Sequence, residues 1–162
     1  MVTDEGPDSP PRAPRAELVE KALRVVPLLE AYFRHAHVEM PAELRLVFAK
    51  NHLSARHAAV LSQLTVAHTL GVGELAHRMR VSIATVSELV SDLGQAGLLQ
   101  RREDPGDRRK VLVSLAETAR PSVEEFVAVR SAPLLRVLQS MGRPDRQVFA
   151  DGLAAWARET ED

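Results

Sequence analysis

Apolar residues recur at helical spacing through most of this chain. Between residues 16 and 38, Leu18, Val25 and Leu29 follow one face of a helix, and Pro27 within it predicts a kink or a split. Residues 98–102 are expected to form a short strand, and the alternation over residues 110–115 is typical of a second one. Further helices are expected over about residues 41–51, 54–67, 72–79, 83–95 and 117–141, with a last one ending near residue 158. The pattern predicts a mainly α protein with a small β-hairpin.

The centre of the chain has the clearest local signals. Ser82 is a typical helix N-cap, and Gly97 suits the left-handed position just past a helix end. The apolar residues between them are spaced as one buried stripe: Val86, Leu89, Val90 and Leu93. A strong turn signal, Asp-Pro-Gly-Asp at residues 104–107, joins the two strands. Two capped helices followed directly by a hairpin predict a winged helix-turn-helix.

Four segments follow from this pattern. Residues 1–15 hold four prolines and few apolar groups, so we expect a disordered tail. Residues 54–115 are expected to form the winged helix-turn-helix DNA-binding domain. The helices of residues 16–53 and 116–162 have more apolar surface than this small domain could cover, and pairing with a second copy would bury it. We therefore predict a homodimer held together by N- and C-terminal dimerisation helices.

Composition narrows the class of protein. Cysteine is absent, which excludes disulfides and thiolate metal sites, and no apolar run is long enough to span a membrane. The first residues contain no apolar signal-peptide core, so we expect a cytoplasmic protein without a membrane partner. The formal net charge of -1 does not by itself indicate a nucleic-acid binder. A DNA-binding function would therefore depend on local charge.

Catalytic and metal-binding patterns are missing from the sequence. It contains no phosphate-binding glycine loop and no zinc-protease or serine-hydrolase motif, so we expect no enzyme. The six histidines do not join acidic residues at ligand spacing, and His35 and His37 are two residues apart, which places them on different faces of a helix. We expect no metal and no cofactor, and a metal-dependent regulator is kept only as an alternative.

Four stretches of the chain match the sequence pattern of a known family. They are residues 73–76 (GELA), 84–87 (ATVS), 97–102 (GLLQRR) and 104–115 (DPGDRRKVLVSL). In these stretches the chain resembles the MarR family of bacterial transcriptional regulators. The resemblance implies a homodimer whose two winged domains bind a pseudo-palindromic operator in double-stranded DNA. It also implies a repressor that a small-molecule effector releases by binding between the dimer helices and the winged domain.

The helix that begins after Ser82 is the candidate recognition helix. Its N-terminal end would enter the major groove, where short polar groups meet base edges. Ser82, Thr85 and Ser87 supply hydroxyl groups there, and Ala84 could contact a thymine methyl group. An exposed, well-capped surface helix is the structural alternative, which the wing that follows disfavours.

Glu88 departs from the family pattern, in which this position is usually basic. A carboxylate facing the duplex would be repelled by phosphate, and two alternatives stay open. Glu88 accepts a hydrogen bond from the N4 amine of cytosine, or it pairs with Arg80 or Arg56 and stays off the DNA.

The turn of the wing is the more specific signal. By resemblance, Arg109 enters the minor groove, where the negative potential is strongest, and Asp107 orients its guanidinium group. Arg108 and Lys110 are expected on flanking phosphates, and either Arg101 or Arg102 would reach the phosphate backbone from the strand. A solvated charged turn is the structural alternative.

Candidate effector contacts are fewer. Tyr32, His35 and His57 fall on segments that would line the pocket that the resemblance implies. The rival function is a winged-helix protein–protein interaction module without sequence-specific DNA binding. The near-neutral net charge and Glu88 favour this rival, whereas the arginines of the wing disfavour it.

Overall fold

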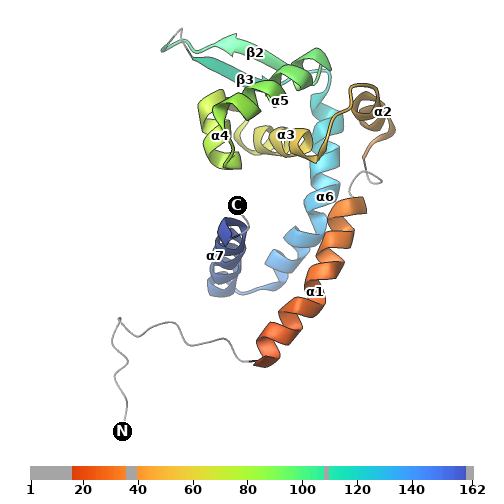
Figure 1. The fold of residues 1–162 in the computed structure, drawn as a ribbon, viewed down its shortest axis with the longest axis vertical. Coiled ribbons are helices and arrows are strands. Elements are labelled where there is room, and N and C mark those ends of the chain that lie inside the picture. The colour runs from red at the N-terminus through yellow and green to blue at the C-terminus, as the bar shows by residue number, and fades with distance from the viewer. Residues whose placement is uncertain (1–15, 36–39, 108–109, 160–162) are drawn as a thin grey trace. The chain divides into compact units, whose positions relative to one another are not determined.

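The computed structural model describes residues 16–35, 40–107 and 110–159, which belong to two compact units that divide after residue 38. The described part of the first unit is α1 (Ala16–His35). The helices and strands of the second unit follow in chain order in Figure 1: α2 (Ala42–Lys50), α3 (Ala55–Ala67), β1 (Thr69–Gly71), α4 (Val72–Met79), α5 (Ile83–Gln95), β2 (Leu99–Glu103), β3 (Val111–Leu115), α6 (Arg120–Ser140) and α7 (Arg143–Glu159). The predicted mainly α fold is confirmed.

Helix α1 runs through Pro27 without interruption, so of the two outcomes predicted for this residue, a kink or a split, the split does not occur. A proline removes one backbone donor, and the turns on either side of Pro27 keep the helix continuous. Among the described side chains of α1 none is buried, and Leu18, Leu23 and Leu28 are exposed. The predicted tail of residues 1–15 and the predicted extension to residue 38 lie outside the described residues.

The strands form one antiparallel sheet in the order β1-β3-β2. The register between β2 and β3 runs from Leu99 opposite Leu115 to Glu103 opposite Val111. Strand β1 pairs with the other edge of β3, with Thr69 opposite Ser114. The expected two-stranded hairpin is therefore a three-stranded sheet. Three residues are too few to show alternation, so β1 could be recognised only by its pairing with a distant strand.

The core of the second unit is apolar and lies among the helices of the winged domain, the sheet and the first turns of α6. The largest fully buried side chains include Phe126, Leu61, Leu64, Leu75 and Leu93. The stripe predicted on α5 is confirmed, since its four residues are at most 7% exposed. Gly97 adopts the predicted left-handed conformation, with φ +75°. The apolar pattern of α5 therefore fixes which of its faces is turned outward.

The last two helices bury little of their apolar surface within one chain. Only Val123 and Phe126 of α6 are buried, and among the described residues of α7 none is. The exposed large apolar side chains of these helices are Val129, Leu134, Leu135, Val137, Val148, Leu153 and Trp156. None of the described helices is both long and apolar enough to cross a lipid bilayer.

Candidate DNA interface

The start of α5 is fixed by a local hydrogen-bonded cap. The Ser82 Oγ accepts a hydrogen bond from the Thr85 backbone N–H at 3.0 Å, and the two hydroxyl oxygens lie 2.8 Å apart. One turn further, the Ser87 hydroxyl donates to the Ile83 carbonyl at 2.8 Å. A hydroxyl has a single hydrogen to donate, so Ser87 would meet DNA as an acceptor. The predicted hydroxyl contacts therefore lie at a rigid, exposed helix start.

Opposite the buried stripe, α5 presents an outward face with one residue on each successive turn. Spacings of four, three and four residues place these on one side: Ala84, Glu88, Ser91 and Gln95. Ala84, Glu88 and Gln95 are exposed and Ser91 is half-buried. The Gln95 Nε2 donates to the Ser91 Oγ at 3.4 Å. The helix contains no lysine or arginine, so its outward face has no cation.

Ile83 belongs to the candidate interface and was missed by the sequence reasoning. It is 62% exposed at the first position of α5, beside an open groove of about 570 Å³ between the helix starts and the wing. The groove is lined by residues that include Val72, Ile83, Ser87, Lys110 and Leu112. Ile83 stands three residues before Val86 and seven before Val90, so helical spacing alone would place it at the edge of the buried stripe. Only the structure shows that its side chain is exposed.

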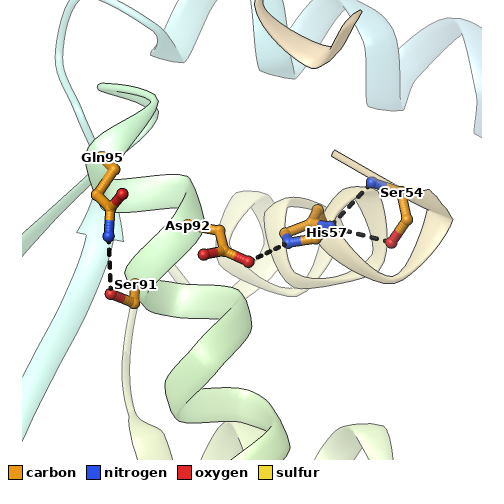
Figure 2. A network of polar contacts seen from close by, with 5 residues as sticks. All are labelled: Ser54, His57, Ser91, Asp92 and Gln95. Atoms are coloured by element: carbon orange, nitrogen blue, oxygen red, sulfur yellow. Dashed lines mark hydrogen bonds and ion pairs between the residues drawn. The ribbon is translucent and has the colours of Figure 1, made fainter. Parts of the chain in front are cut away.

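Asp92, the second carboxylate of α5, is held by another helix. Its Oδ2 lies 3.3 Å from the Nε2 of His57, a buried residue on α3 (Figure 2). The Nδ1 of the same ring accepts the Ser54 backbone N–H at 2.9 Å, and the Ser54 hydroxyl lies 3.0 Å from it. Because Nδ1 is an acceptor here, the neutral ring has its hydrogen on Nε2, facing the carboxylate. His57 thus caps α3 and connects it to α5.

Replacing His57 separates these two contacts. His57→Gln keeps an acceptor at the third helical position, as in a capping box, but is too short to reach Asp92. We expect it to lower the free energy of unfolding by about 1 kcal/mol, the worth of one hydrogen bond. His57→Ala also loses the cap, so we expect a decrease of about 2 kcal/mol. Urea denaturation at fixed protein concentration measures both.

The matched control for these variants is Asp92→Asn, which keeps an acceptor oxygen toward the imidazole ring. Its free energy of unfolding should stay within about 0.5 kcal/mol of the parent protein. Equal instability of the glutamine and alanine variants of His57 would contradict the capping role.

The two arginines of β2 leave the sheet on opposite sides. Arg101 lies opposite Val113 and Arg102 opposite Leu112, and successive side chains of a strand point to alternate faces. Both arginines are exposed. The sheet therefore offers one guanidinium group on each face.

The described part of the wing turn is closed by short-range hydrogen bonds. The Asp104 Oδ1 accepts the Gly106 N–H at 2.7 Å, and the Lys110 N–H donates to the Asp107 carbonyl at 2.8 Å. The Lys110 Nζ lies 3.9 Å from the Asp107 Oδ2. Arg108 and Arg109, and with them the predicted pairing of Asp107 with Arg109, lie outside the described residues.

The remaining candidate residues do not extend this surface. His57 is buried with protein partners at both ring nitrogens, and Tyr32 lies half-buried on α1, in the other compact unit. The side chain of His35 is outside the described residues. Within residues 16–35, 40–107 and 110–159, no three histidine or acidic side chains gather as a metal site.

Sequence comparison places this arrangement in a family. A family model described as MarR family matches residues 53–111. The HTH-type transcriptional repressor MdtR of Bacillus subtilis is 30% identical over 133 residues, which cover 82% of this chain and 83% of the relative. The uncharacterised HTH-type transcriptional regulator YfiV of the same organism is 27% identical over 110 residues, covering 68% and 69%. These relatives are transcriptional regulators rather than enzymes.

Solved structures share the fold. FabT of Streptococcus pneumoniae, determined in complex with DNA, superposes with a TM-score of 0.62 at 14% identity, covering 88% of this chain and 94% of that one. PcaV of Streptomyces coelicolor, in complex with its natural ligand, gives 0.56 at 23% identity, covering 94% and 99%. Two helices joined by a tight turn, followed by a β-hairpin that pairs with a short strand before them, define a winged helix-turn-helix protein. The chain belongs to the MarR family and is a DNA-binding transcriptional regulator.

Proposed function

We propose that this protein is a repressor that binds a pseudo-palindromic operator as a homodimer. The observation that supports this most directly is the exposed N-terminal half of α5, which lies beside the wing across one open groove. In such proteins the helix enters the major groove and the wing reaches the adjacent minor groove. The two half-sites would lie about one helical turn, roughly 34 Å, apart. The relative MdtR is named a transcriptional repressor, which supports repression rather than activation as the function proposed here.

Exposed apolar helices support the dimer. The described residues of α7 leave Val148, Leu153 and Trp156 exposed, and α1 leaves Leu18, Leu23 and Leu28 exposed. Apolar side chains on amphipathic helices are stabilised when a second copy covers them. We therefore assign residues 16–53 and 116–162 to dimerisation and residues 54–115 to DNA binding. The protein would act in the cytoplasm, on the chromosome, and without catalysis.

The test is selection of bound fragments from genomic DNA by the purified protein. Enrichment of fragments that share a pseudo-palindrome is the expected result. Recovery of a random set of fragments at low salt would overturn the proposal. The genes beside enriched fragments would also indicate the chemical class of the effector.

Operator affinity should depend steeply on salt. Cations that neutralise phosphates release counterions, so we expect the affinity to fall about a thousandfold between about 50 and 200 mM salt. Lys110→Ala should reduce the slope of log affinity against log salt by about 1 for each subunit. The matched control is Lys50→Ala, an exposed lysine at the end of α2, which should leave the slope unchanged. A slope near zero for the parent protein would contradict backbone binding.

The rival function, a protein–protein interaction module, has one observation in its favour. Helix α5 carries two carboxylates and no cation, whereas nucleic-acid surfaces are usually basic. The selection experiment separates the two functions, because an interaction module would not enrich a shared DNA sequence.

A small-molecule effector is the third part of the proposal. A cavity of about 190 Å³ lies between α2, the end of α5 and the start of α6, lined by residues that include Leu44, Val47 and Leu98. It is smaller than the usual ligand pocket of about 300–1,000 Å³, so a typical effector would have to part α2 from α6. Such a ligand acts only if it binds the DNA-competent and DNA-incompetent forms with different affinities.

A further inference from the structure

The two carboxylates of α5 look equivalent in the sequence, but the structure gives them different surroundings. Asp92 points toward α3 and meets the His57 ring, whereas Ser91 and Gln95 lie on another side of the helix (Figure 2). Glu88 is exposed on the outward face, one turn after Ala84. Glu88 is therefore the charged group that the outward face of α5 presents.

The pairing alternative for Glu88 is not realised in the described structure. The ion pairs of the described residues use other carboxylates, and none joins Glu88 to Arg56 or Arg80. Its neighbour one turn back is Ala84, whose methyl side chain leaves room for a base edge to approach. The carboxylate is therefore both accessible and uncompensated within the described chain.

An ionised carboxylate only accepts hydrogen bonds, and this limits what it can read. In the major groove the exocyclic amines of cytosine and adenine are donors, whereas guanine offers two acceptors and thymine offers one. Adenine places its N7 acceptor beside the amine, where it would repel a carboxylate, and cytosine has no such acceptor on its own edge. Cytosine is the base that fits Glu88 best.

We propose that Glu88 is a specificity-determining residue that selects a cytosine in each half-site by accepting a hydrogen bond from its N4 amine. The inference rests on the proposed operator binding and names the base chemistry of that same interface. A carboxylate near phosphate is repelled on every sequence, and the cytosine bond offsets this repulsion only at the correct site. Glu88 therefore also acts against binding to other sequences.

The experiment uses the full-length protein and the operator obtained by selection. Each C·G pair of the half-site is replaced by T·A, symmetrically in both half-sites, and affinity is measured by titration at fixed salt. For the parent protein one of these replacements should weaken binding about tenfold to a hundredfold. For Glu88→Ala the same replacement should change affinity by less than about twofold, with tighter binding to unrelated DNA.

Two further variants sharpen the result. Glu88→Gln should shift the preference at this position to adenine, because an amide pairs in a bidentate manner with adenine N6 and N7. Asp92→Asn, the matched control on the same helix, should keep the preference for cytosine. Thermal unfolding reports whether all variants fold alike.

The outcomes separate this inference from the proposed function. If Glu88→Ala binds all sequences more tightly but keeps every base preference, Glu88 reads no base and the inference is overturned while operator binding stands. If the parent protein binds operator and scrambled DNA equally, the proposed function fails and the inference fails with it.

Discussion

Replacing Phe126 with alanine is expected to lower the free energy of unfolding by about 3–5 kcal/mol. The ring is 1% exposed on α6, which packs against α3, and it belongs to the central apolar cluster. Truncation removes the transfer free energy of a large side chain and leaves a cavity that the packed helices only partly fill. Denaturant unfolding at fixed protein concentration measures the change, since dimerisation makes apparent stability depend on concentration.

The matched control for Phe126 is Val66→Ala on α3, where the side chain is 77% exposed. This variant should lie within about 0.5 kcal/mol of the parent protein. A loss below about 1 kcal/mol for Phe126→Ala would show that α6 does not share the core of the winged domain.

Removing the guanidinium of Arg109 is expected to have the largest effect on DNA binding. The family resemblance implies that Arg109 enters the minor groove, and on that expectation Arg109→Ala should cost about 1–3 kcal/mol of operator binding for each subunit. A dimer loses this contact twice, so the combined effect is multiplicative in affinity. Titration of the selected operator at fixed salt measures the loss, and thermal unfolding should be unchanged.

Arg45→Ala is the control for Arg109, because Arg45 is exposed on α2, outside the wing. It should bind the operator like the parent protein. Unaltered affinity of Arg109→Ala would remove Arg109 from the interface and leave the other wing cations to account for phosphate binding.

Most helix limits of this protein were predictable because the signals that set them are local. Ser82 caps α5 through a bond to Thr85, and Gly97 takes the left-handed conformation two residues after the helix. The i, i+3, i+4 stripe of α5 predicted its buried face, since a helix that packs on a core must turn its apolar side inward. These features depend on residues within a few positions of one another.

Strand β1 could not be predicted in the same way. Thr69, Leu70 and Gly71 show no pattern of their own and become a strand only by pairing with Leu112, Val113 and Ser114. Non-local pairing of this kind leaves little trace in a short segment, because its backbone hydrogen bonds are made with a distant part of the chain.

The same difference between local sequence signals and tertiary contacts applies to the candidate interface. The sequence by itself determined that α5 has a polar face. This face has hydroxyl groups at the start of the helix, two carboxylates and no cation. Only the tertiary structure decided that these carboxylates differ, because the ring that holds Asp92 comes from His57, 35 residues earlier on α3. The sequence of one helix shows which of its side chains are polar. The neighbouring helices determine which of these side chains form contacts within the protein and which face outward.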